Sequence, residues 1–210
     1  MVRVLDLTLT ISDGMPGVEV KPRHRRPQDA WNSSVLSLYS HCGTHMDSPA
    51  HLNSSDSGID LVPLEQCYGP AWVLRVPNVA PRSLILVEHL GSIAEQLQPG
   101  DGLLIATGWS SRWGTPGYRE ALPRISRELA LWCVNRQVRV LGVEPPSVAD
   151  VNNRQEVEEI HGILLKGGVI IVEGLTNLEA ISKPRVIFAA FPLKIQGGDG
   201  SPVRAVAFEE

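Results

Sequence analysis

The stretch His41–His51 reads HCGTHMDSPAH and places three histidines and one aspartate within eleven residues. The whole 210-residue chain holds only six histidines, so half of them lie in this one segment. Imidazole and carboxylate groups gathered this closely favour a metal site, catalytic or structural, over a hydrogen-bonded loop or a pH-sensitive switch. The candidate ligands and proton carriers of the stretch are His41, His45, Asp47 and His51.

A straight strand would not bring these side chains to one metal ion. At ~3.3 Å per residue, the Cα atoms of His41 and His45 would lie ~13 Å apart, whereas ligand atoms lie ~2 Å from a metal. Gly43 permits a sharp bend, and Pro49 ends regular strand pairing. We therefore predict that a strand over Val35–Ser40 delivers a tight loop at the end of the sheet, where catalytic groups are often held.

Two further candidate ligands lie more than a hundred residues later. His161 is on the apolar side of a predicted helix, and Glu173 ends the apolar run VIIVEG, where a carboxylate entering the interior needs a partner. A reversal at the Gly-Gly pair between helix and strand would bring the two side chains together. A core histidine and a surface acid are the alternatives. Histidine and carboxylate ligands without a thiolate suit zinc or manganese.

The remaining histidines and the cysteines are weaker candidates. His24 lies in a basic segment, Arg23–Arg26, that is interpreted as a solvated loop, and His89 lies in a polar segment. Cys42 alternates away from the neighbouring histidines and is interpreted as a small buried residue. The three cysteines lack CxxC spacing, which argues against a disulfide framework and fits a reducing cytoplasm.

Composition narrows the class of protein. The net charge of -4, with 43% hydrophobic and 20% charged residues, is typical of a soluble globular protein without a nucleic-acid-binding surface or a membrane-binding arm. The N-terminal MVRVLDLTLT is predicted to be a strand and not a signal peptide, and the apolar runs are too short to span a bilayer. We predict one cytoplasmic domain over residues 1–210, with a small molecule as its partner.

The pattern of elements predicts an α/β domain with a mixed sheet. Alternating or apolar runs predict strands at Arg3–Leu9, Val35–Ser40, Ala71–Val76, Leu103–Thr107, Val138–Val143, Val169–Glu173, Arg185–Ala190 and Val203–Phe208. Helices are predicted at Ile125–Gln137, with Ser126 as its cap, at Gln155–Gly168 and, less regularly, at Val87–Leu97. No GxGxxG follows a strand, and the glycines of QGGDGSP are interpreted as a turn between two late strands.

The segment HCGTHMDSPAHL resembles the HxGTHxDxPxH signature of the cyclase-family metal-dependent hydrolases, which include bacterial kynurenine formamidase and isatin hydrolase. Similar segments continue along the chain: VLDLTLTISDGMP, LIATGWSSRW, LGVEPPSV, HGILLKGGVIIVEGLTNLEAI and FPLKIQGGDGSPVRAVA. The resemblance therefore covers nearly everything from Val4 to Ala207.

The resemblance implies roles for individual residues. His41, His45 and Asp47 match the family's first metal triad. Asp47 matches a carboxylate that bridges to a second metal, which His161 and Glu173 complete, although some members hold only one ion. His51 matches the histidine that the family uses as proton donor and acceptor.

The same resemblance implies the fold, the assembly and the reaction. The expected fold is the family's swivelling β/β/α domain, in a homodimer or homotetramer. The expected reaction is metal-dependent hydrolysis of the C–N bond of a small amide, formamide or lactam. Metal-assisted cyclase or other carbonyl chemistry is one alternative. Another is a non-catalytic protein with a structural metal, whose site would be closed by protein ligands at every position.

Two departures from the family concern the substrate. Kynurenine formamidases carry a tryptophan in the loop after the first strand, but here SDGMPGVEV has no aromatic residue, which predicts that N-formylkynurenine is a poor substrate. Glu144 stands where relatives often have aspartate. Trp31, Trp109 and Trp113 would line either a substrate pocket or the core, and the core is favoured.

Overall fold

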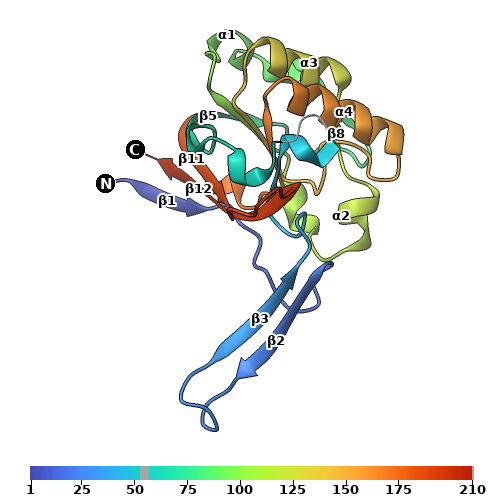
Figure 1. Ribbon diagram of the computed structural model, residues 1–210. Helices are drawn as coiled ribbons and strands as arrows, with labels where there is room; N and C mark the ends of the chain where they lie inside the picture. The colour runs from blue at the N-terminus through green and yellow to red at the C-terminus, as the bar shows by residue number, and fades with distance from the viewer. Residues whose placement is uncertain (53–56, 210) are drawn as a thin grey trace.

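A closed, mixed sheet is the centre of the protein (Figure 1). The computed structural model describes residues 1–52 and 57–209. The ring of strands runs in the order β12 (Gly200–Glu209), β11 (Arg185–Pro192), β5 (Tyr68–Arg75), β7 (Gly102–Ala106), β9 (Val140–Val143), β10 (Ile170–Glu173) and β4 (His45–Asp47). The first three residues of β12 pair with β4 and close the ring, whereas its last residues pair with β1 (Arg3–Asp6). The predicted mixed α/β fold is confirmed, and its sheet closes into a barrel.

The four parallel strands of this ring are buried on both faces. Strand β7, GLLIA, is buried at every residue, and Leu104 points into the barrel while Leu103 and Ile105 face the helices. Parallel strands covered on both sides are typically continuous apolar runs of this kind. Each fully buried side chain of this size contributes about 1.5–3 kcal/mol. The two faces of the sheet therefore belong to two separate apolar cores.

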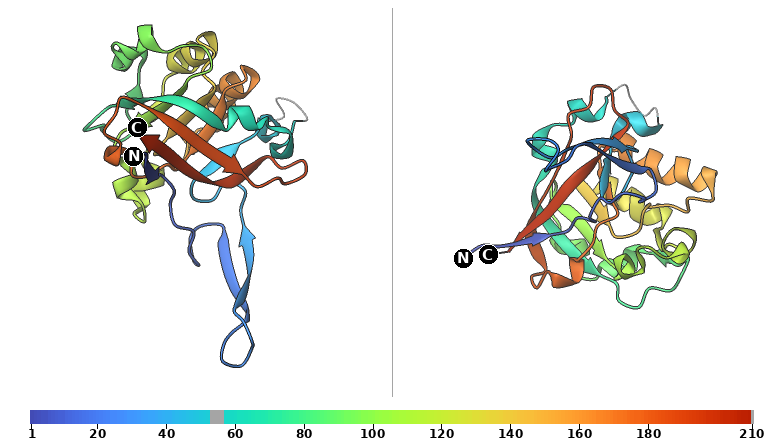
Figure 2. Two further views of the ribbon diagram at one scale, coloured as in Figure 1. Left: turned by 90° about the vertical axis from the view of Figure 1, so that its left-hand side faces the viewer. Right: turned by 90° about the horizontal axis from the view of Figure 1, so that it is seen from below.

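Helices cover the outer face of the parallel strands (Figures 1 and 2). The main ones are α3 (Arg127–Asn135) and α4 (Arg154–Lys166), and both begin at caps. The Ser126 hydroxyl accepts a hydrogen bond from the Leu129 amide at 3.1 Å, which confirms the predicted cap. Shorter elements are α1 (Ile93–Gln96), α2 (Pro116–Glu120), β6 (Leu84–Ile85) and β8 (Arg124–Ile125). The continuous helix predicted over Val87–Leu97 is wrong, because a 3₁₀ turn and the four-residue α1 occupy this segment.

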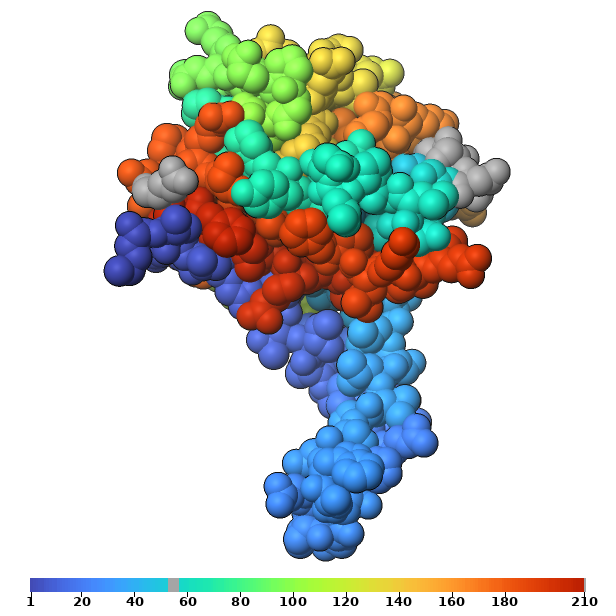
Figure 3. Space-filling view, turned by 60° about the vertical axis from the view of Figure 1, so that its left-hand side comes forward, coloured from blue at the N-terminus to red at the C-terminus, as the bar shows by residue number. Residues whose placement is uncertain are grey.

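A two-stranded hairpin projects away from the barrel (Figures 1 and 3). It consists of β2 (Val18–His24) and β3 (Ser33–Leu38), which pair with each other and with no strand of the barrel among the described residues. We call the segment Val18–Leu38 the arm. The strand predicted over Val35–Ser40 is present as β3 and leads to the bend at Gly43, but, contrary to the prediction, it pairs with β2 and does not belong to the main sheet. Strand β2 was not predicted, because Pro22 interrupts its alternating pattern.

The three cysteines are free and buried. Cys42 is 2% exposed and packs with Met15 and Val18 at the base of the arm, so its interpretation as a small buried residue is confirmed. Among the described residues, no helix is long and apolar enough to cross a membrane.

Candidate functional site

The short strand β4 places part of the histidine-rich segment within the barrel. It lies between β10 and β12, with Glu173 opposite His45 and Gly200 opposite Asp47. Gly43, just before the strand, has a φ of 60°, a left-handed conformation that glycine adopts without strain. The bend that the ligand spacing requires is therefore present where it was predicted.

Glu173 joins two histidines that are far apart in the sequence. Its Oε2 lies 3.2 Å from Nε2 of His45, and its Oε1 lies 3.3 Å from Nε2 of His161. His161 reaches this position from α4, and its Nδ1 lies 3.0 Å from the Val157 carbonyl oxygen. The predicted meeting of His161 and Glu173 across the helix-to-strand reversal is confirmed.

Asp47 lies at the centre of the cluster and is 1% exposed. Its Oδ1 lies 2.8 Å from Nδ1 of His41 and 3.7 Å from Nε2 of His45. Its Oδ2 lies 3.7 Å from Nε2 of His161 and is buried without a hydrogen bond among the described residues. A buried carboxylate oxygen without a partner is costly, and a bound cation would satisfy it. The donor atoms of His41, His45 and Asp47 lie within 4.8 Å of one another, as do those of Asp47, His51 and His161.

The pKa values of the cluster show that its buried carboxylates favour positive charge on the groups beside them. Burial alone would lower the pKa of His41, but hydrogen bonds and charges from Asp47 and Asp199 raise it to about 9. Burial acts in the same direction on His45, and its neighbours Glu173 and Asp47 again raise the pKa. Burial would raise the pKa of Glu173, yet hydrogen bonds from His161 and His45 hold it well below its ordinary value. Protons on the imidazoles therefore balance the carboxylates, at positions where a metal cation would do the same.

His51 occupies the more open side of the cluster. It lies on a 3₁₀ turn, Pro49–Leu52, and its side chain is 23% exposed. Its ring centroid lies 4.2 Å from that of His41, and its Nδ1 lies 3.9 Å from Oδ2 of Asp199. Burial is the main cause of the lowered pKa of His51, and the charges of His41 and His161 lower it further while that of Asp47 opposes them. A neutral imidazole at this edge can accept a proton and pass it on.

Asp199 is a member of the site that the sequence did not indicate. Its Oδ2 lies 2.9 Å from Nε2 of His41, and His41, His51 and Asp199 form a third group whose donor atoms could hold a cation. The residue lies in QGGDGSP, which was interpreted only as a turn. No sequence signal singled out Asp199; in the structure, the adjacent Gly200 lies where a Cβ atom would be 2.8 Å from Cε1 of His41 and 2.9 Å from the Met46 carbonyl oxygen. A glycine is needed there so that His41 can lie against β12.

Tyr39 is an aromatic residue beside the site. Its ring centroid lies 5.4 Å from that of His41, and the residue is 58% exposed. Trp109 is buried, in agreement with the prediction that tryptophans belong to the core. The prediction of a core position is wrong for the other two tryptophans, because Trp31 is 60% exposed on the arm and Trp113 is 37% exposed.

Glu144 anchors the loop that follows β7. The carboxylate is fully buried, and its Oε2 accepts hydrogen bonds from the Thr107 amide at 2.7 Å, the Thr107 hydroxyl at 2.8 Å and the Trp109 amide at 3.1 Å. Its Oε1 accepts another from the Ser110 hydroxyl at 3.1 Å. The residue that departs from the family pattern is therefore a structural anchor of this loop.

Removing this anchor is expected to destabilise the protein. Glu144→Ala should lower the free energy of unfolding by about 3 kcal/mol or more, because it leaves several buried donors without an acceptor. Urea unfolding at pH 7 measures the loss. Glu144→Asp keeps the charge and is the matched control, for which a smaller loss is expected. A loss below about 1 kcal/mol for Glu144→Ala would contradict the role of these hydrogen bonds.

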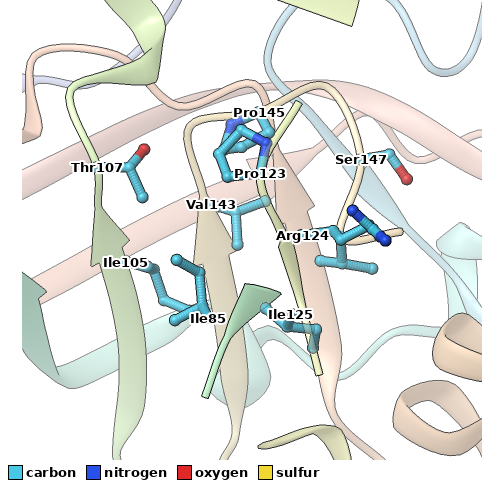
Figure 4. A pocket seen from close by; sticks show the side chains of 10 residues that line it. Ile85, Ile105, Thr107, Pro123, Arg124, Ile125, Val143, Pro145 and Ser147 are labelled. Atoms are coloured by element: carbon cyan, nitrogen blue, oxygen red, sulfur yellow. The ribbon is translucent and has the colours of Figure 1, made fainter. Parts of the chain in front are cut away.

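A small cavity lies beside this loop but is not a substrate site (Figure 4). Its volume is about 10 Å³, and its walls are mainly apolar side chains such as Ile85, Ile105 and Val143. A space of this size holds about one water molecule. This cavity is therefore too small to hold a substrate.

Comparison with known proteins agrees with this geometry. Residues 5–150, well over half of the chain, match the model of the Cyclase family, described as "Putative cyclase". A kynurenine formamidase of Geobacillus thermodenitrificans is 34% identical over 175 residues, which are 83% of this chain and 78% of the relative. Isatin hydrolase A from Ralstonia solanacearum superposes with a TM-score of 0.83 at 25% identity, covering all of this chain and 92% of that one. A structure described as a potential metal-dependent hydrolase with cyclase activity has a TM-score of 0.82 at 25% identity, covering all of this chain and 99% of the other.

Proposed function

Because this chain belongs to the cyclase family, we propose that it is a metal-dependent hydrolase that cleaves the C–N bond of a small amide, formamide or lactam. The observation that carries the proposal is the buried Asp47 between three histidines, with an Oδ2 atom that has no hydrogen-bond donor among the described residues. Relatives named kynurenine formamidase and isatin hydrolase support hydrolysis of a C–N bond.

The proposed ligands fit a divalent metal. Three imidazoles and two carboxylates, with no thiolate, suit zinc or manganese. Asp47 has oxygens directed at histidines on two sides, which suits either one ion or a carboxylate bridge between two. The proposed ligand set is His41, His45, Asp47, His161 and Glu173.

The residues around the ligands would carry the proton transfers. When bound, the metal makes water a better nucleophile at neutral pH and polarises a carbonyl oxygen. His51, on the open side, would take a proton from the attacking water and deliver one to the leaving nitrogen, since an imidazole exchanges protons readily near pH 7. Asp199 lies 2.9 Å from Nε2 of His41, so its carboxylate would orient that ring, and it lies 3.9 Å from Nδ1 of His51.

A structural metal is the second candidate function, and the open edge of the site argues against it. Structural sites are enclosed by protein ligands at every position. Here the side chain of Asp199 is 50% exposed and that of His51 is 23% exposed, so one side of the cluster faces solvent. This edge gives a substrate a way to reach the ligands. Metal-assisted cyclase chemistry would use the same edge, and product analysis separates it from hydrolysis.

The direct test is to remove the metal and restore it. Protein stripped with a chelator should lose hydrolysis of a panel of formamides, lactams and simple amides, and zinc or manganese should restore it. Mass spectrometry of the products distinguishes hydrolysis, which adds the elements of water, from ring closure, which removes them. Full activity in demonstrably metal-free protein would contradict the proposal.

We expect N-formylkynurenine to be a poor substrate. The loop Ser12–Val20 has no ring to stack on the substrate, and stacked aromatic contacts are worth ~0.5–1.5 kcal/mol beyond area burial. Tyr39 supplies an exposed ring beside His41. Steady-state kinetics with metal-replete enzyme test the expectation. A kcat/KM above ~10⁴ M⁻¹s⁻¹ would overturn it and make kynurenine formamidase the activity of this protein.

A further inference from the structure

Thr44 lies between the two segments that carry the proposed metal ligands His45 and Glu173. It directly precedes His45, which stands opposite Glu173 in the pairing of β4 with β10. Thr44 is 2% exposed, so its hydroxyl group needs partners inside the protein. That hydroxyl donates a hydrogen bond to the carbonyl oxygen of Gly174, the residue after Glu173, at 2.6 Å. One hydroxyl group therefore joins the chain neighbours of two ligands whose Nε2 and Oε2 atoms lie 3.2 Å apart.

The backbones of the two segments are also in contact at this place. A Cβ atom on Gly174 would lie 2.4 Å from the Gly43 carbonyl oxygen, so glycine is needed for this approach. The same carbonyl oxygen lies 3.1 Å from Nδ1 of His45 and orients its imidazole ring. Because this carbonyl group shares a rigid peptide plane with the Thr44 amide, a shift of Thr44 would also shift the group that orients His45.

The Thr44 hydroxyl also holds the N-terminal segment of the chain. It accepts a hydrogen bond from the Leu9 amide at 2.9 Å. Beside Leu9, Thr8 forms an antiparallel bridge with Leu175, so the N-terminal segment runs along the chain that follows Glu173. Leu9 lies 35 positions from Thr44 in the sequence, and Gly174 lies 130 positions away. The side chain therefore uses its donor and an acceptor position to connect three distant segments.

We propose that Thr44 is a positioning residue of the candidate site, which holds His45 and Glu173 at the separation that metal binding requires. The inference rests on the proposed metal-dependent function. In this role Thr44 touches neither metal nor substrate and transfers no proton. Groups that orient metal ligands typically change metal affinity or activity by about 10–100-fold when they are substituted.

Thr44→Val and Thr44→Ser separate the hydroxyl group from the shape of the side chain. Valine keeps the shape but leaves the Leu9 amide and the Gly174 carbonyl oxygen without a partner. The dissociation constant for zinc should therefore rise about 10–100-fold in Thr44→Val. Serine keeps the hydroxyl group, and its constant should stay within about threefold of the wild-type value. Competition with a chromophoric chelator measures these constants without any substrate.

Thr8→Val is the matched control. The Thr8 hydroxyl donates to the Ala205 carbonyl oxygen at 3.0 Å and accepts from the Ala205 amide at 2.8 Å, so it has the same kinds of partner as the Thr44 hydroxyl. These partners belong to β12 and not to the segment of His45 or Glu173. Urea unfolding of the metal-free protein should show a loss of stability in both valine variants. Only Thr44→Val should weaken zinc binding, and Thr8→Val should change the constant less than about threefold.

Hydrogen exchange in the wild-type protein provides a test that does not depend on the folding of Thr44→Val. If the Thr44 hydroxyl links Leu9 to the ligand-bearing segments, zinc should slow exchange of the Leu9 amide more than exchange of the Ala205 amide. Both amides donate to a threonine hydroxyl, at 2.9 Å and 2.8 Å, so the comparison is between like groups.

Several results would overturn the role of Thr44. Equal losses of zinc affinity in Thr44→Val and Thr8→Val would do so, as would a serine variant that binds zinc no better than the valine variant. Equal protection of the Leu9 and Ala205 amides by zinc would contradict it as well. A wild-type protein that binds neither zinc nor manganese would overturn both this role and the proposed function. Zinc binding that depends on Thr44, in a protein that hydrolyses no member of the amide panel, would support the positioning role and reject only the proposed reaction.

Discussion

Asp47→Ala is expected to abolish stoichiometric metal binding and with it all measurable hydrolysis. Asp47 lies between His41, His45 and His161, and no other carboxylate among the described residues contacts all three. Losing it would remove a proposed ligand and a negative charge that would attract the cation. Elemental analysis after gel filtration measures the metal content, and a Tm series with added zinc or manganese measures binding without activity.

The Tm series gives this prediction a second readout. A metal at 100 times its dissociation constant stabilises the folded protein by about 2.7 kcal/mol, so wild-type protein should show a clear rise in Tm. The rise should be absent in Asp47→Ala. Glu158→Ala, an exposed carboxylate on α4 that pairs with Arg154, is the control and should keep both the metal and the Tm rise. Full metal content in Asp47→Ala would show that the site is wrongly placed. His41→Ala and His45→Ala should also lose metal, to a smaller extent.

His51→Asn should keep its metal and its fold while kcat falls by roughly 10²–10⁴, the usual scale of general acid–base catalysis. The side chain lies at the open edge of the cluster, and asparagine preserves its polar character without carrying protons near pH 7. Steady-state kinetics on the best substrate from the amide panel, with metal content measured on the same sample, test this expectation.

The two possible failures of the His51 prediction have different meanings. Loss of metal from His51→Asn would make His51 a ligand, which the grouping of its ring with Asp47 and His161 also permits. An unchanged rate with full metal content would remove His51 from the mechanism. Asp199→Asn is a useful companion variant, since it alters the orienting carboxylate beside both His41 and His51 and should reduce the rate less than His51→Asn.

Local sequence determined much of the candidate site. The spacing of His41, His45 and Asp47 requires a bend, and Gly43 provides it at a φ of 60°. The 3.6-residue period of α4 placed His161 on the buried side, and the short Gly-Gly reversal brought it to Glu173. These relations span few residues, so backbone geometry and apolar periodicity suffice to predict them.

Pairing between strands far apart in the sequence determined the parts of the site and fold that local sequence patterns did not predict. Asp199 contacts His41 across 158 positions of the chain only because β12 pairs with β4 and closes the barrel. No local pattern specifies which distant strands become neighbours, since packing of the whole apolar core selects them. The same reason explains the arm: alternation in Val35–Ser40 predicts a strand, but β3 pairs with β2 outside the barrel. The sequence by itself determined the histidines and carboxylates of the candidate site and the class of fold, whereas the tertiary structure alone decided the closure of the sheet, the place of Asp199 and the exposed apolar face of the arm.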